Sequence, residues 1–341
     1  MEKLIIIIIG FLIFALLNNF LVKKEFLLNY GGSAHQKFSG ITNVPLTGGI
    51  FIFFSILYLY FNEIESIIFF LSLLFILGLA TDLKITDSPK IRFLIQTALL
   101  FLIVYSSDLQ ITPTRVYVID LIISNVLLSY LFSTFCLLIL INGSNFIDGL
   151  NGLLVGYYLL ISIVFYQLDL INFLNIENSN SLLFLVILLF LFLLNLFKKS
   201  FMGDTGAYIL GFFYGYLLIK IYVEYQTFSP FFVILLLWYP CFENLFSILR
   251  KFQLKKSPIK PDNNHLHQLI FFYLKKKYKH KSIFANNYGS LIILSYNLII
   301  FSFGIQNVSN TQYQIILLML NILVYCAIYF KLFAFKYKLK V

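Results

Sequence analysis

The chain has 341 residues, of which 60% are hydrophobic and only 12% carry a charged side chain. This composition is typical of a membrane protein with many spans and excludes an ordinary soluble domain. The net charge is +10, but the attraction of basic loops to anionic lipid explains such an excess, so no nucleic-acid binding is inferred. All three cysteines lie in apolar runs, which argues against a disulfide framework and a cysteine metal site.

Hydrophobic segments divide the chain along its whole length. Eleven of them approach the length that crosses a bilayer as a helix, and because several are short the alternative count is ten. The segments are residues 4–22, 46–61, 65–80, 92–106, 118–141, 152–168, 181–197, 206–222, 230–248, 288–304 and 313–333. The first lacks a small-residue cleavage site, which favours a retained helix. The sequence therefore predicts an all-α, polytopic membrane protein with a single domain over residues 1–341.

Basic residues predict the orientation, because lysine and arginine collect on the cytoplasmic side of a membrane. With the N-terminus outside and the C-terminus inside, all 25 lysines and arginines except Lys3, Arg115 and Lys220 fall on the inner side. The longest inner segment, residues 249–287, becomes a basic cytoplasmic loop. We expect a multi-pass protein of the plasma (inner) membrane whose polar inner loops face the cytoplasm.

Three carboxylates stand where membrane segments meet the inner side: Asp82, Asp148 and Asp204. Asp82 ends a segment, where the helix dipole disfavours an acid, so we expect nearby cations such as Lys84 and Arg92 to balance it. Asp204, in F-M-G-D-T-G-A, precedes a segment whose first N–H groups would favour phosphate oxygens, and its carboxylate could share Mg²⁺ with a diphosphate. The structural alternatives are an interfacial acid balanced by lysines for the former and a plain N-cap for the latter.

The stretch from Asn142 to Gly152, N-G-S-N-F-I-D-G-L-N-G, interrupts two apolar runs with amides, an acid and glycines. Polar groups so close to a span are costly unless they find partners. Asn142, Asn145 and Asp148 recur at every third position, which would drift round a helix, so we expect an irregular, glycine-bent segment that lines a cavity. Amides suit a nucleobase, a ribose or a sugar amide. The alternative is polar residues that satisfy one another between helices.

Two further inner loops carry histidines. His265 and His267 lie in P-D-N-N-H-L-H-Q, and without a third histidine or a cysteine they favour anion binding over zinc. The glycine-rich residues 31–49 contain His35 and Lys37, which alone is weak evidence. No Walker A, G-x-S-x-G or H-E-x-x-H pattern occurs in the sequence.

Five motifs follow one another between His35 and Gln268. They are H-Q-K with V-P-L-T-G-G, G-L-A-T-D-L with S-P-K-I-R-F-L-I-Q, N-G-S-N-F-I-D-G-L-N-G, F-M-G-D-T-G, and H-L-H-Q. In this order they resemble the polyprenyl-phosphate N-acetylhexosamine-1-phosphate transferases of the glycosyltransferase family 4 type, closest to the undecaprenyl-phosphate N-acetylglucosaminyl-1-phosphate transferase branch.

The resemblance implies a reaction. A sugar 1-phosphate passes from a UDP-N-acetylhexosamine, such as UDP-N-acetylglucosamine, to polyprenyl (undecaprenyl) phosphate, giving polyprenyl-diphospho-sugar and UMP. The implied cofactor is Mg²⁺, with Mn²⁺ as a substitute, and a homodimer is plausible. The step would begin a cell-surface polysaccharide such as O-antigen.

The resemblance also implies residue roles. Asp204 would bind Mg²⁺, and Asp82 would position or deprotonate the lipid phosphate. The nucleotide-sugar site would contain Asn142, Asn145, Asp148, Phe201, His265 and His267, and the phosphates would meet Lys37, Lys84 and Arg92.

Two positions depart from the family pattern. Thr81 and Asn151 stand where aspartates are common, and direct attack by the lipid phosphate is therefore slightly favoured over an aspartyl intermediate.

The alternative class is a transporter or flippase for a lipid-linked saccharide. A transporter is expected to place polar residues near the bilayer midplane on broken helices. Here most polar residues lie at one interface, and Glu243 in the ninth segment is the main exception.

Overall fold

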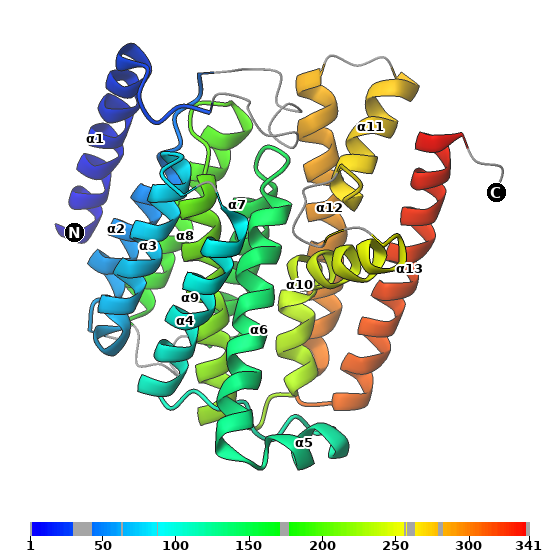
Figure 1. Ribbon diagram of the computed structural model, residues 1–341. Coiled ribbons are helices and arrows are strands. Elements are labelled where there is room, and N and C mark those ends of the chain that lie inside the picture. Colours follow the sequence, from blue (N-terminus) through cyan, green and yellow to red (C-terminus); the bar gives the residue numbers. More distant parts are fainter. Residues whose placement is uncertain are drawn as a thin grey trace.

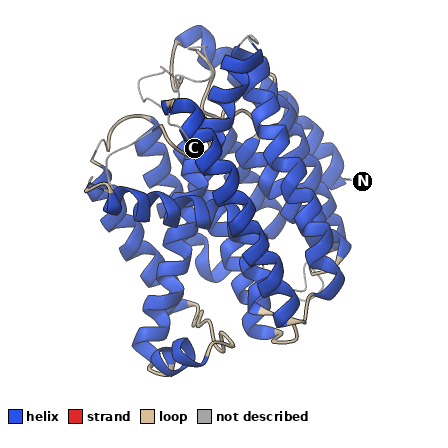
Figure 2. Cartoon of the chain, turned by 90° about the vertical axis from the view of Figure 1, so that its right-hand side faces the viewer, coloured by secondary structure: helices blue, strands red, loops and turns tan. Residues whose placement is uncertain are grey.

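The computed structural model describes residues 2–29, 43–62, 64–86, 88–170, 177–255, 257, 263–278 and 282–338. Within these ranges the chain forms a bundle of thirteen α-helices and no β-sheet (Figures 1 and 2). The helices are α1 (Glu2–Lys24), α2 (Gly48–Tyr60), α3 (Ile68–Asp82), α4 (Pro89–Ser106), α5 (Tyr117–Ile123), α6 (Val126–Ile147), α7 (Leu153–Gln167), α8 (Asn178–Leu196), α9 (Gly203–Glu224), α10 (Pro230–Gln253), α11 (Leu266–Tyr278), α12 (Ser282–Gly304) and α13 (Thr311–Tyr337).

The predicted membrane segments correspond in order to apolar helices. Nine of the described helical segments have the length and hydropathy to cross a membrane, and α2 and α7 are shorter apolar helices. The all-α, polytopic prediction is therefore confirmed. One boundary was wrong, because the expected segment 118–141 is divided into α5 and α6. The Asn125 side chain accepts hydrogen bonds from the backbone nitrogens of Leu127 and Leu128, which starts a new helix there.

Helix α9 forms the centre of the bundle, and 89% of its most apolar stretch is buried. Glycines on its neighbours allow this close approach. A Cβ atom on Gly78 of α3 would lie 2.6 Å from Thr205 Cα, and one on Gly49 of α2 would lie 2.3 Å from Gly206 N. Small residues of this kind let membrane helices pack backbone against backbone. The start of α9 is thereby fixed against α2 and α3.

Hydrogen bonds bring many helix ends together at one end of the bundle, the upper end in Figure 1. The first residue of α2 bonds to the segment before α9, through Gly48 N to Phe201 O at 2.9 Å. The turn after α6 bonds to the start of α12, through Asn151 N to Asn286 Oδ1 at 2.6 Å, and to the end of α8, through Gly152 N to Asn195 Oδ1, also at 2.6 Å. The segments that carry the polar motifs therefore lie together at one end of the bundle, as the sequence predicted. The side of the membrane on which this end lies stays a prediction.

We predict that Gly78→Ala destabilises the protein, because the new methyl group would overlap the backbone of Thr205. Overpacking of this kind typically costs about 1–3 kcal/mol. The measurement is the thermal unfolding midpoint of purified protein in detergent. Gly10→Ala is the matched control, since its Cβ would meet only Phe51 at an ordinary 3.7 Å. Equal midpoints for the two variants would contradict this account of the packing.

Candidate functional site

Asp204, in the first turn of α9, is held by side chains from two other helices. Arg92 Nη1 of α4 donates to Asp204 Oδ2 at 2.8 Å, and Asn145 Nδ2 of α6 donates to Oδ1 at 2.7 Å. The side chains of Arg92 and Asp204 remain 25% and 24% exposed. The pair is therefore accessible to a ligand while three helices fix its position.

Asp82, at the end of α3, caps the beginning of α9. Its Oδ1 accepts a hydrogen bond from Asp204 N at 2.8 Å, and its Oδ2 accepts from Thr205 N at 3.1 Å and Thr205 Oγ1 at 2.6 Å. A carboxylate at a helix N-terminus is favourable, so the positive end of α9 offsets the unfavourable end of α3.

This geometry corrects two expectations. The first N–H groups of α9 that were expected to favour phosphate are bound to Asp82. Asp204 follows the N-cap position instead of occupying it, because the helix begins at Gly203. The hydrogen-bond partners of Asp82 are the backbone and side chain of the first turn of α9, which the sequence did not predict.

Gly203 is required by the contact between Asp82 and α9. Its φ of +68° lies in the left-handed region, which side chains other than glycine rarely adopt. A Cβ atom there would also lie 2.5 Å from Asp82 Oδ2. The glycine of F-M-G-D-T-G thus serves the cap, which the sequence motif alone did not reveal.

The stretch from Asn142 to Gly152 is helical in its first half, which corrects the expected irregular segment. Helix α6 continues to Ile147, and only residues 148–152 form the turn. The glycine at 143 permits contact with α10, because a Cβ there would lie 2.1 Å from Pro240 O. Asn142 and Asn145 are three residues apart on this helix and share a face. Asn142 Nδ2 donates to Leu138 O at 2.9 Å and to Gln96 Oε1 of α4 at 3.3 Å.

Asp148 follows α6 and completes a cluster of three acids. The residue is half-buried, and its carboxylate makes no hydrogen bond within the described part of the chain. Burial, reinforced by the charges of Asp204 and Asp82, raises the pKa of Asp148 well above its ordinary value. Asp82, Asp148 and Asp204 are thus near enough to influence one another electrostatically, and a cation would relieve their repulsion.

Glu243, a fully buried acid of α10, anchors the histidine loop, by which we mean residues 263–267 at the start of α11. His265 Nδ1 lies 3.0 Å from Glu243 Oε1, which also accepts from Leu266 N at 3.1 Å, and Tyr325 Oη donates to Oε2 at 2.9 Å. The sequence indicated Glu243 only as the main polar residue away from the membrane interface and did not place it at the site. A carboxylate inside an apolar span is itself a signal of function, and here its partner is a predicted site residue.

The histidines pack against the stretch that follows Asn142. The His265 ring centroid is 5.0 Å from that of Phe146, and a Cβ atom on Gly149 would lie 2.6 Å from His267 Nε2. His265 and His267 are both buried, and the anion binding expected of them stays a prediction. Arg250 of α10 donates to Asn264 O at 2.6 Å and thereby holds the segment that precedes His265.

Several other residues singled out in the sequence are placed as follows. Phe201 is half-buried, and its backbone bonds to Pro45 O and Gly48 N, both at 2.9 Å. The Thr81 hydroxyl donates to Leu77 O at 2.9 Å, within its own helix. Lys37 and His35 lie outside the described residues, as do Lys260 and Asp262 of the basic loop.

The donor set suits Mg²⁺ bound together with phosphate better than a metal held by protein alone. Among the described residues no group of three histidine, cysteine or acidic side chains could hold a metal ion. Mg²⁺, however, takes one or two carboxylates and completes its shell with phosphate and water. Asp148 has free oxygens, and the carboxylate of Asp204 can accept more than the two side-chain hydrogen bonds that it receives. These two acids could therefore hold such an ion.

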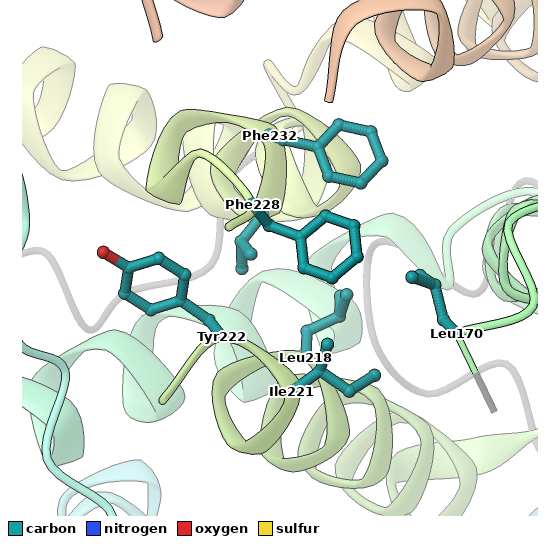
Figure 3. Close-up of a pocket in the computed structure, with 7 residues that line it drawn as sticks. Leu170, Leu218, Ile221, Tyr222, Phe228 and Phe232 are labelled. Carbon is teal, nitrogen blue, oxygen red and sulfur yellow. The ribbon is translucent and has the colours of Figure 1, made fainter. Parts of the chain in front are cut away.

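An apolar hollow lies far from these residues, at the other end of α9 (Figure 3). Its lining includes Leu218 and Tyr222 of α9, Phe232 of α10 and Leu170. Tyr222 is about 27 Å along the helix from Asp204, at 1.5 Å per residue. This hollow is therefore separate from the polar site.

The fold and site define a class: a polytopic membrane protein whose acids, amides and one arginine converge at one end of the helix bundle. Residues 64–222, a little under half of the chain, match the model of the glycosyl transferase family 4. The matched range contains Asp82, Arg92, Asn145, Asp148 and Asp204.

Curated relatives extend the similarity beyond that range. The chain is 26% identical over 317 residues to an undecaprenyl-phosphate alpha-N-acetylglucosaminyl 1-phosphate transferase of Thermotoga maritima, covering 91% of this chain and 90% of that protein. It is 31% identical over 200 residues to a phospho-N-acetylmuramoyl-pentapeptide-transferase of Dictyoglomus thermophilum, covering 56% and 61%. A relative from Salmonella typhi, with the same name as the Thermotoga protein, is 25% identical over 245 residues, covering 67% and 65%.

Asn151 holds helices together, and we predict that Asn151→Asp destabilises the protein. Its Nδ2 donates to Asn287 Oδ1 at 2.8 Å, and Asn287 Nδ2 is in turn bound to Leu196 O at 3.2 Å. An aspartate would place an oxygen against Asn287 Oδ1, at a cost of about 2 kcal/mol. Thermal unfolding in detergent measures the loss.

The control for this substitution is Asn125→Asp, where the side-chain oxygen accepts backbone N–H groups and either residue can cap the helix. Unchanged stability in Asn151→Asp would show that position 151 tolerates the acid that is common in the family.

Proposed function

We propose that the protein transfers a sugar 1-phosphate from a UDP-N-acetylhexosamine to polyprenyl phosphate, giving polyprenyl-diphospho-sugar and UMP. The names of its relatives support the substrates. The structural observation that carries the proposal is Asp204, held by Arg92 and Asn145 at the end of a membrane bundle. One substrate is a lipid and the other is water-soluble, so their phosphates can meet only at such an interface.

In the proposed reaction an oxygen of the lipid phosphate attacks the β-phosphorus of the UDP-sugar. The bond from that phosphorus to the bridging oxygen breaks, and UMP leaves with this oxygen. Phosphoryl transfer depends mainly on positioning and on neutralising phosphate charge. Arg92 supplies fixed positive charge for this purpose, and Asn145 keeps the Asp204 carboxylate in place.

The arrangement of Asp82 supports direct attack over a covalent aspartyl intermediate. Both of its oxygens accept hydrogen bonds from the first turn of α9. An attack by this carboxylate on phosphorus would break the cap that positions Asp204. We therefore assign Asp82 the role of positioning Asp204, whereas the resemblance implied that it positions or deprotonates the lipid phosphate.

The proposal includes Mg²⁺, or Mn²⁺, held by Asp204 with Asp148. When bound, such an ion would supply positive charge that offsets the negative charge of the diphosphate. The proposal also places the site on the cytoplasmic face of the plasma membrane, because nearly all basic residues follow that orientation. A homodimer rests on the family resemblance alone and is tested by light scattering of the purified protein.

The decisive experiment follows UMP release by purified protein with undecaprenyl phosphate, Mg²⁺ and a panel of UDP-N-acetyl sugars. We expect release with one sugar and its loss on addition of EDTA, since chelation would remove the ion that neutralises the diphosphate. Heat-inactivated protein is the control. No release from well-folded protein across the panel would contradict the proposed activity, and transport of a lipid-linked saccharide in vesicles would then be measured.

We predict that Asp204→Asn lowers kcat/KM by about 100-fold or more, the usual effect of losing one preorganised polar group in an active site. The matched control is Glu224→Gln, which neutralises an exposed acid at the other end of the same helix. Both variants are checked for insertion and a single elution peak before the assay. Near-normal turnover in Asp204→Asn would refute the role given to this residue.

A further inference from the structure

Gln96 of α4 has a buried amide nitrogen, Nε2, without a hydrogen-bond partner among the described residues. The side chain is only 1% exposed. Buried polar atoms nearly always have a partner, so an unpaired donor here calls for an explanation. Gln96 lies one helical turn from Arg92, and residues at this spacing share a helix face.

The hydrogen bonds of Asn142 determine which atom of Gln96 is unpaired. Leu138 O can only accept, so the Asn142 atom beside it at 2.9 Å must be the donor Nδ2. The same nitrogen lies 3.3 Å from Gln96, which must therefore present its acceptor, Oε1. The remaining Gln96 atom is then a donor, and its missing partner is an acceptor.

We propose that Gln96 Nε2 donates a hydrogen bond to a phosphate oxygen of a bound substrate. This inference rests on the proposed function and adds a binding residue to it. Arg92, on the same face of α4, attracts anions, and a phosphate offers several acceptor oxygens and no strong donor. Residues one turn apart are separated by about 5–6 Å, which a phosphate or diphosphate bound between them can bridge. Arg92 and Gln96 together form a donor face for phosphate.

Two phosphate groups could occupy this face: that of the polyprenyl phosphate and the diphosphate of the UDP-sugar. Helix α4 begins at Pro89, so Gln96 lies further from the site end than Arg92. The experiment separates the two by measuring binding of undecaprenyl phosphate and of UDP individually. Calorimetry with purified protein in detergent reports these affinities without any need for turnover.

Gln96→Glu is the informative variant, because it keeps an acceptor for Asn142 and replaces the Nε2 donor with oxygen. We expect about 10-fold weaker binding of one ligand and unchanged binding of the other, in line with the loss of a hydrogen bond to a charged group. The ligand affected identifies the phosphate. Gln96→Met, which has a similar volume, repeats the test if the acidic variant does not fold.

Gln314→Glu is the matched control, since Gln314 of α13 is also buried and has one unpaired amide atom, Oε1. It bonds to Gly304 O and Asn307 O through Nε2, so its substitution is expected to lower stability without changing either affinity. If only water binds to Gln96 Nε2, the folded Gln96 variants will bind both ligands with affinities within about twofold of the unsubstituted protein. That result would overturn the proposal. Equal weakening of both ligands, reproduced by Gln314→Glu, would also overturn it. If the ligands bind but no UMP is released, the proposed reaction fails while the Gln96 result stands.

Discussion

The contact between Asp82 and the first turn of α9 is the constraint on which the site depends. A carboxylate that ends one membrane helix accepts the unpaired N–H groups that begin another, so two unfavourable helix ends stabilise each other. The contact is possible because Gly203 lacks a side chain where one would overlap Asp82. Once α9 is fixed in this way, Asp204 faces outward from its first turn, within reach of Arg92 and Asn145.

A second anchor of the same kind holds the histidine loop. Glu243 is buried in a membrane helix, and its two oxygens receive hydrogen bonds from the loop and from Tyr325 of α13. A buried carboxylate is tolerated only when its oxygens are satisfied in this way. The loop is thereby fixed beside the turn that carries Gly149, where His267 packs. The half-buried Asp82 therefore orients the first turn of α9, and the buried Glu243 orients the histidine loop. The carboxylates of Asp204 and Asp148 can still accept a ligand.

Thr81 and Asn151, the two residues that depart from the family pattern, make structural hydrogen bonds. The Thr81 hydroxyl bonds within α3, and Asn151 joins the start of α7 to the start of α12. An aspartate at 151 would not make the Asn287 contact, because an ionised carboxylate has no donor. The polar site of this chain is thus concentrated on the single acids Asp82, Asp148 and Asp204.

The sequence by itself determined the class and most of the architecture. Apolar length and the distribution of polar residues predict eleven apolar helices with the motifs at one end, because a lipid bilayer requires internally bonded, apolar spans whatever their packing. The positions of Asp82, Asp148 and Asp204 in the chain also predicted that they lie on one side of the membrane, since each ends or begins a span there.

Only the tertiary structure decided which groups pair. The partner of Asp82 is the backbone of α9, the partner of Arg92 is Asp204, and the partner of His265 is Glu243. These contacts join residues far apart in the chain, and they depend on the rotation and depth of each helix. Close glycine contacts such as Gly78 on Thr205 and Gly143 on Pro240 set that rotation and depth. A pattern of residues along one chain does not specify such distances, because they arise from the packing of several helices at once.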